Sequence, residues 1–188
     1  MRGVILTLCA TVTMSLVAVC GFQSASVAQD GMPAMGAPAE IKALAGMDGT
    51  YDVTIKMKMG PDAPWTESKG KATVEMVLDG CAQKMSFQGE MMGMPFSGLS
   101  YLVYNRETKQ WQTTWIDNMM GSMSYYTGMM ENGVLTVSGV DHMMGMEFHT
   151  RAMTYDMAAD GFKWKMEQSM DGGKTYAEAM QMEYKRVH

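Results

Sequence analysis

Apolar and polar residues alternate along most of the chain from Thr50 onward. In the segment 51–59, Tyr51, Val53 and Ile55 alternate with charged or hydroxyl side chains, a period of two that is typical of a β-strand with one dry and one wet face. The alternation recurs in the segments 72–78, 84–88, 95–104, 111–117, 123–129, 134–139, 146–155, 162–170 and 176–184. The pattern therefore predicts about ten strands.

Short polar segments separate the expected strands. The clearest are Asp79-Gly80, Asn105-Arg106, Glu131-Asn132-Gly133, Asp160-Gly161 and Asp171-Gly172-Gly173. These residues accept positive φ or form Asx turns, and connections this short make neighbouring strands antiparallel. We expect an all-β fold, an up-and-down barrel of about ten antiparallel strands, because closure removes exposed sheet edges. A β-sandwich is the structural alternative.

Residues 1–28 have the features of a secretory signal peptide. Arg2 precedes an apolar run from Val4 to Val19, which is short for a membrane span, and Ser26-Val27-Ala28 supplies the small residues of a cleavage site. We expect cleavage after Ala28 and a periplasmic or secreted protein. Lipid anchoring at Cys20 is the alternative.

The remaining chain predicts one domain. Residues 29–40, rich in Met, Gly, Pro and Ala, are expected to form a flexible arm. Residues 41–188 are expected to form the barrel, with a short helix at 41–44. Cleavage would leave Cys81 as the single cysteine, so an internal disulfide cannot stabilise this domain.

Four stretches resemble a bacterial family known as domain of unknown function 1579 and, more distantly, the lipocalin-like barrels. They are Ala43-Leu44-Ala45-Gly46 leading to Tyr51, the segment 89–99 (GEMMGMPFSGL), Trp115-Ile116-Asp117, and the segment 169–175 (SMDGGKT). The resemblance implies a calycin-like barrel that can hold a small ligand, and it implies no catalytic mechanism. Some calycin-like relatives bind haem through a barrel histidine, but His149 has the opposite parity to Phe148, which predicts that it faces solvent.

Charge and motifs exclude several function classes. Lys and Arg number 15 against 20 Asp and Glu, a net charge of −5, so no basic surplus favours nucleic-acid binding. The sequence has no Gly-x-Ser-x-Gly, HExxH, phosphate-loop or dinucleotide motif. We therefore expect a binding protein rather than an enzyme, without membrane insertion of the mature chain.

Methionine is unusually frequent, with 26 residues among 188. Six lie on apolar strand faces and are expected to pack in the core: Met57, Met76, Met85, Met166, Met180 and Met182. Three clusters instead lie between strands: Met91-Met92-Gly93-Met94, Met119-Met120-Gly121-Ser122-Met123 and Met143-Met144-Gly145-Met146. They fall in the third-to-fourth, fifth-to-sixth and seventh-to-eighth connections. Because successive turns of a meander alternate between the barrel's ends, we expect all three at one end.

Two functions could use such an end. An apolar, adaptable rim suits a small apolar ligand entering the barrel, for which the candidate residues are Trp111, Trp115, Asp117, Phe162 and Trp164. Thioethers are also soft ligands for Cu(I) or Ag(I), for which the candidate residues are Met91, Met92, Met94, Met119, Met120, Met123, His142, Met143, Met144 and Met146. A structural role, or a methionine sink for oxidants, is the remaining alternative.

Asp117 shares its predicted strand face with Trp111 and Trp115, which places a carboxylate inside the barrel or at its rim. A buried charge needs partners. We expect either an ion pair with Arg106 or Arg151, or a carboxylate that orients a ligand.

Overall fold

The computed structural model of the protein describes residues 36–143 and 145–188. The expected signal peptide, Cys20 and the first part of the arm lie outside the described residues, as does Met144. The described residues belong to one compact unit, residues 35–188. No helix in this described part is both long and apolar enough to cross a membrane.

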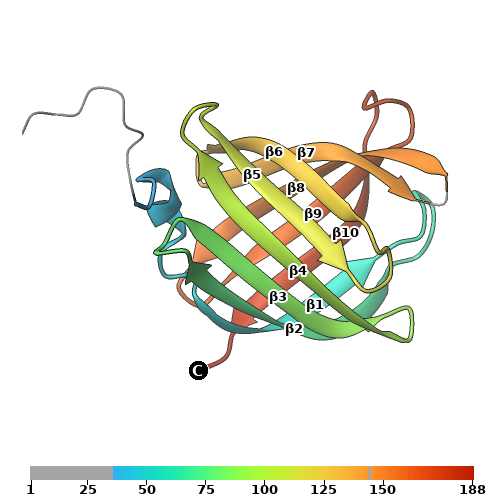
Figure 1. The fold of residues 1–188 in the computed structure, drawn as a ribbon. Helices are drawn as coiled ribbons and strands as arrows, with labels where there is room; N and C mark the ends of the chain where they lie inside the picture. Colours follow the sequence, from blue (N-terminus) through green and yellow to red (C-terminus); the bar gives the residue numbers. More distant parts are fainter. Residues whose placement is uncertain (1–35, 144) are drawn as a thin grey trace, which may run out of the picture. The chain divides into compact units, whose positions relative to one another are not determined.

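Ten antiparallel strands close into a barrel in the order β1-β10-β9-β8-β7-β6-β5-β4-β3-β2 (Figure 1). They are β1 (Gly49–Met57), β2 (Thr66–Val77), β3 (Ala82–Met91), β4 (Met94–Asn105), β5 (Gln110–Asp117), β6 (Met123–Glu131), β7 (Val134–Met143), β8 (Met146–Ala158), β9 (Gly161–Ser169) and β10 (Ala177–Arg186). Consecutive strands are neighbours, and β1 also pairs with β10. The all-β, up-and-down barrel expected from the sequence is confirmed, and the sandwich is excluded.

Several strand limits differ from those expected. β1 ends at Met57 and β9 at Ser169, whereas β2 begins at Thr66 and β7 extends to Met143. Thr66 pairs with Met57 at the start of β2, and β7 pairs with β8 out to Met143. Hydrogen bonding to a neighbouring strand thus extends β2 and β7 beyond the residues in which apolar and polar side chains alternate.

Two hairpins show why glycine follows Met92 and Asn132. Met92 and Gly93 have φ of 52° and 76°, and Asn132 and Gly133 have φ of 50° and 77°. Two successive positive φ values are what a two-residue type I′ turn requires. These turns connect β3 to β4 and β6 to β7.

The expected short helix is present only as one turn of 3-10 helix, η1 (Glu40–Leu44). Ala39 precedes it without a side-chain capping hydrogen bond, and so short a segment gains little from intrahelical bonding. Ile41 and Leu44 are buried in the same core cluster as Tyr51. Packing against the barrel therefore holds η1 at one end (Figure 1), which we name the η1 end.

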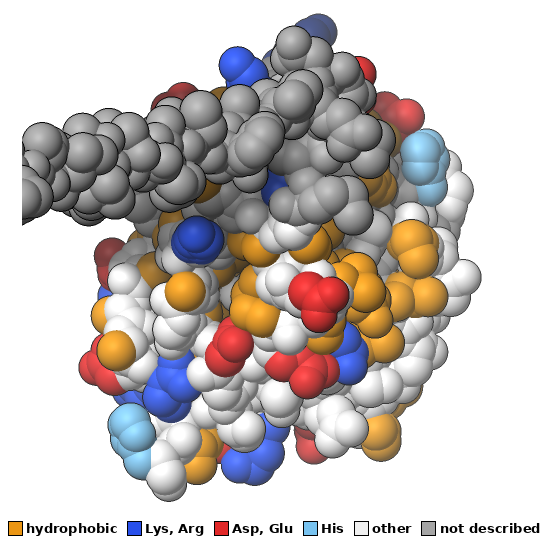
Figure 2. Space-filling view, turned by 60° about the vertical axis from the view of Figure 1, so that its left-hand side comes forward, with side chains coloured by type: hydrophobic (Ala, Val, Ile, Leu, Met, Phe, Trp, Pro, Cys, Tyr) orange, Lys and Arg blue, Asp and Glu red, His pale blue; other side chains and the backbone are white. Residues whose placement is uncertain are grey.

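Hydrogen bonds from Arg186, at the end of β10, hold the segment that follows η1. Its guanidinium donates to the carbonyl oxygen of Ala159 at 2.6 Å and to the hydroxyl of Tyr51 at 2.9 Å. It also donates to the carbonyl oxygens of Gly46 and Asp48. Figure 2 turns this side of the molecule forward, and acidic and basic side chains there are interspersed with hydrophobic ones.

Candidate functional site

Aromatic packing fills the barrel near the η1 end. The rings of Phe162 and Tyr184 stack with centroids 4.1 Å apart, and Tyr51 meets Phe162 edge-on at 5.3 Å. Trp111 is 3% exposed and packs edge-on against Tyr104 at 5.5 Å. Trp111 and Phe162, two of the residues predicted to contact a ligand, thus belong to a well-packed part of the core.

The methionine clusters lie at the opposite end. The connections β1–β2, β3–β4, β5–β6, β7–β8 and β9–β10 all lie there (Figure 1), and we name this end the mouth. The clusters beginning at Met91, Met119 and Met143 occupy three of these connections, as the strand count predicted. The six methionines expected in the core do pack in it or against it. Met180 is buried, and the others are partly buried: Met57, Met76, Met85, Met166 and Met182.

A polar cluster centred on Asp141 lies inside the barrel near the mouth. Asp141 pairs across strands with buried Phe148, and directly paired residues share a sheet face. Its carboxylate accepts hydrogen bonds from the hydroxyls of Ser124 at 2.6 Å, Thr150 at 2.6 Å and Tyr126 at 2.8 Å. β6, β7 and β8 therefore each contribute to one carboxylate-centred network.

Tyr126 is fixed in this cluster as a neutral donor. Burial is the largest cause that raises the pKa of its phenol far above the ordinary value, and the Asp141 carboxylate raises it further. The ring fits because Gly139 lies beside it, where an added Cβ would meet Cδ1 of Tyr126 at 2.6 Å. Thr150 is 1% exposed, so its hydroxyl depends on Asp141 for an acceptor.

Asp117 lies nearby on β5 with partners that differ from those expected. Its Oδ2 accepts from the indole Nε1 of Trp115 at 2.8 Å, and its Oδ1 accepts from the backbone amides of Met119 and Met120. The ion pair expected for Asp117 is not formed. None of the ion pairs among the described residues includes this carboxylate. Asp117 instead holds Trp115 and the start of the β5–β6 turn.

Arg151 and Arg106 bond elsewhere. Arg151 donates its Nε to Glu167 at 2.9 Å, and Arg106 donates to the carbonyl oxygen of Gly36. Arg151 alternates with buried Thr150 and Ala152, so it points to the outer face, where Asp117 does not reach.

Trp115 forms the aromatic side of the mouth region. Its indole stacks on Phe96 with centroids 6.2 Å apart. Gly98, paired across strands with Asp117, leaves the space that the indole occupies, because a Cβ there would collide with the Trp115 ring. Ser100 and Thr113 add a hydroxyl pair on the same wall at 3.1 Å.

The interior is consequently amphipathic. The polar groups Ser100, Thr113, Asp117, Ser124, Tyr126, Asp141 and Thr150 come from β4 to β8. Interior side chains on β1, β2, β3, β9 and β10 are mainly apolar, among them Ile55, Val74, Phe87, Trp164, Met166 and Met180, although Gln83 on β3 and Ser169 on β9 are buried polar residues. One wall can hydrogen-bond to a ligand while the other contacts its apolar part.

The sequence pattern indicates Asp117 as a site residue but does not by itself indicate Asp141, Ser124, Tyr126 and Thr150. Parity could have found Asp141, because it follows Val137 and Gly139 at intervals of two and so shares their face. The expected strand ended at residue 139, which removed Asp141 from consideration.

The candidate metal ligands divide between the two sheet faces. Met91 and Met94 form a cross-strand pair, as do Met143 and Met146, and Met91 packs against the core. Their parity places them toward the interior rim. Met92, Met119 and Met120 lie in turns and are exposed, while Met144 is outside the described residues.

Met123 and both mouth histidines lie on the outer face. Met123 is 65% exposed and pairs with Ile116. His142 pairs with Glu147, and His149 contacts Glu147 through Nε2 at 3.2 Å. His142 is therefore on the opposite sheet face from Met143. Within residues 36–143 and 145–188, no group of three or more His, Cys, Asp or Glu side chains is placed to hold a metal ion.

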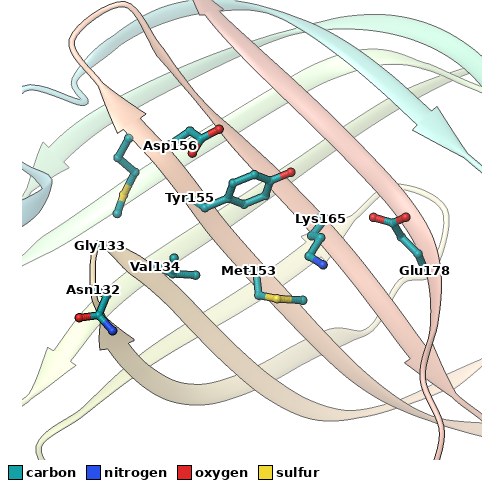
Figure 3. A pocket seen from close by; sticks show the side chains of 9 residues that line it. Asn132, Gly133, Val134, Met153, Tyr155, Asp156, Lys165 and Glu178 are labelled. Carbon is teal, nitrogen blue, oxygen red and sulfur yellow. The ribbon is translucent and has the colours of Figure 1, made fainter.

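A separate groove of about 610 Å³ crosses the outer surface of the barrel (Figure 3). Its lining residues are Asn132, Gly133, Val134, Met153, Tyr155, Asp156, Met157, Lys165 and Glu178. Met153 follows Ala152, which is buried in the core, so the groove faces away from the interior. It is distinct from the Asp141 cluster.

Comparison with known proteins identifies the architecture. A family model described as a protein of unknown function (DUF1579) matches residues 37–186, and no curated protein matches the chain. The structure of Rv2717c from M. tuberculosis aligns with a TM-score of 0.60 at 13% identity, over 81% of this chain and 99% of that one. The S-type phycobiliprotein lyase CPES from Guillardia theta aligns with a TM-score of 0.53 at 12% identity, over 76% and 89%. These likenesses show a shared barrel fold.

Proposed function

The chain belongs to the DUF1579 family, and from its closed barrel we propose that it binds a small, mainly apolar ligand with a polar end, without catalysing a reaction. The ligand's polar end contacts the Asp141 cluster, and its apolar part lies between Trp115 and the mainly apolar wall of β1, β2, β3, β9 and β10. Methionines at the mouth form an adaptable apolar rim. The signal peptide expected from the sequence would place this binding outside the cytoplasm.

The observation that carries the proposal is the position of a carboxylate inside the barrel. Asp141 is surrounded by three hydroxyl donors, and no ion pair among the described residues includes it. If residue 141 served only to fill the core, an apolar side chain would be expected there, because burying a carboxylate costs free energy. The similarity of fold to a phycobiliprotein lyase is compatible with a barrel that holds a small molecule.

Binding of 1-aminoanthracene tests this function. The probe has an apolar aromatic body and an amino donor, and its fluorescence rises in a dry site. We expect saturable binding in the micromolar range, and replacing Trp115 by Ala is expected to weaken it about tenfold, which corresponds to about 1.4 kcal/mol. Trp115→Phe should retain most of the affinity because it keeps an aromatic wall.

Trp65→Ala is the matched control for this titration. Trp65 lies outside the barrel next to Lys58, whose ammonium is 4.9 Å from the ring centroid, so its loss should leave probe affinity unchanged. Thermal unfolding of each variant checks that the barrel is intact. Absence of saturable binding, or an equal loss in Trp65→Ala, would contradict a ligand site inside the barrel.

Binding of Cu(I) or Ag(I) is the second candidate function. The observation that favours it is the placement of three methionine clusters in connections at one end of the barrel. The cross-strand pairs Met91–Met94 and Met143–Met146 add neighbouring thioethers on the rim of the interior. Thioethers select soft ions and do not oxidise to disulfides.

Anaerobic titration with Cu(I) against a competing chelator tests the second candidate. We expect one bound ion, and replacing Met91, Met94, Met143 and Met146 together by Leu should weaken binding at least about tenfold while the core stays apolar. Replacing the outer-face residues Met129 and Met153 by Leu is the control. Binding that is equally strong in both variants would remove the mouth as the metal site.

A further inference from the structure

The outer surface of β4, β5, β6 and β7 differs from the rest of the barrel in charge. The segments 97–103, 112–116, 123–129 and 134–140 contain no Lys, Arg, Asp or Glu. On the other strands many outward positions are charged, as Lys69 and Lys71 are on β2 and Lys163 is on β9. We name the outer surface of these four segments the neutral face.

The neutral face carries a continuous group of exposed apolar and aromatic side chains. Leu99 pairs with Ile116, and Ile116 pairs with Met123, so the three form a row across β4, β5 and β6. Ile116 is 40% exposed and Met123 65%. Tyr101 and Tyr125 flank Thr114 in the next row, and Val140 is also exposed.

A face of this kind is typical of an interaction surface. An exposed group of large apolar side chains rimmed by polar residues marks an interaction surface more often than an isolated exposed residue does. Tyr and Met are also enriched where proteins meet. The Asp141 cluster does not use this face, because its side chains point into the barrel.

We propose that the neutral face is a contact surface between two copies of this chain. Each copy has a net charge of −5, so two copies repel each other over most orientations. The repulsion is smallest where neither surface carries charge. A two-fold arrangement brings the Leu99–Ile116–Met123 row of one copy against the same row of the other, as an isologous dimer requires.

The size of the face sets the strength of the contact. Four strands about 4.8 Å apart, with a rise of about 3.3 Å per residue, give a patch of about 400 Å² over the five to seven residues of each segment. That area is below the approximately 800 Å² per partner of a standard interface. The dimer is therefore weak and reversible, and its Met123 end borders the mouth.

Sedimentation equilibrium of the purified protein over a range of concentrations tests the proposal. The average mass is expected to rise from monomer toward dimer between low micromolar and millimolar protein. Tyr125→Lys and Ile116→Lys each place an unpaired charge in the contact, so the dissociation constant should rise by about tenfold or more. Ile116→Gln, a milder change, should have a smaller effect in the same direction.

Thr73→Lys is the control because Thr73 is exposed on the outer surface of β2 among charged residues. It should leave the dissociation constant unchanged, and added salt should not dissociate the wild-type dimer. A protein that stays monomeric at every concentration would overturn the proposal, as would association that survives both lysine variants. Flotation of the monomer with phosphatidylcholine vesicles, lost in Tyr125→Lys, would assign the face to a lipid surface and also overturn it.

Discussion

Replacing Asp141 by alanine is expected to lower the free energy of unfolding by about 3 kcal/mol, measured by urea denaturation. The substitution removes the acceptor for Ser124, Tyr126 and Thr150 together. Hydrogen bonds to a charged group contribute about 1.5 to 3 kcal/mol each, and removal of the cost of burying the carboxylate offsets part of the loss. Asp141→Asn keeps an acceptor and should cost about 1 kcal/mol.

Asp52→Ala provides the comparison for an exposed carboxylate. Asp52 accepts from Lys71 at 2.7 Å, but their side chains are 66% and 68% exposed, and such pairs contribute less than about 1 kcal/mol. In the Asp141→Ala background, Thr150→Val should be less costly than in the native protein, because the Thr150 hydroxyl has already lost its acceptor. Equal costs for Asp141→Ala and Asp52→Ala would show that the cluster does not stabilise the barrel.

The barrel itself could be predicted because two independent patterns agree. Alternation places Tyr51, Val53 and Ile55 on one face, and all three are buried. Turn residues such as Asn132-Gly133 supply the positive φ values that short hairpins need. Once about ten short-connected strands are expected, closure follows from the cost of free edges.

The Asp141 cluster could not be predicted to the same degree. Alternation assigns a residue to a face but does not give the register between strands. Ser124, Asp141 and Thr150 meet only because β6, β7 and β8 pair in one particular register, which the sequence does not state. A strand end placed two residues early was enough to hide the central carboxylate.

The expected ion pair of Asp117 shows a different limit. Charge alone suggested Arg151 as a partner, although parity places Arg151 with outward residues and Asp117 with inward ones. In the structure Arg151 bonds to Glu167 on the outer surface, and Asp117 bonds to Trp115 and to turn amides. Applying parity to both residues would have excluded Arg151 as the partner.

The two ends of the barrel have different interiors, which bears on function. Near the η1 end, Phe162, Tyr184 and Tyr51 pack ring against ring. Near the mouth, hydroxyl and carboxylate groups replace part of this packing. We therefore expect substitutions at the η1 end to affect stability alone, and substitutions at the mouth to affect stability and binding together.

The barrel is expected to lose stability steeply above pH 10. Burial raises the pKa of Tyr184 far above the ordinary value of about 10, and burial followed by the Asp141 carboxylate does the same for Tyr126. A raised pKa means that the folded state favours the neutral phenol, so this stabilisation is complete below pH 10 and declines as pH rises toward the folded-state values. The free energy of unfolding should fall by about 2 to 3 kcal/mol per pH unit.

Urea denaturation at a series of alkaline pH values measures this slope, and two phenylalanine variants locate its source. Tyr126→Phe removes one of the two phenols whose pKa is raised most and should reduce the slope by about 1.4 kcal/mol per pH unit. Tyr125→Phe changes the adjacent residue, which is 52% exposed on the outer face, and should leave the slope unchanged. A slope that is the same in Tyr126→Phe as in the native protein would mean that Tyr126 can ionise inside the folded barrel, with water already reaching the Asp141 cluster through the mouth.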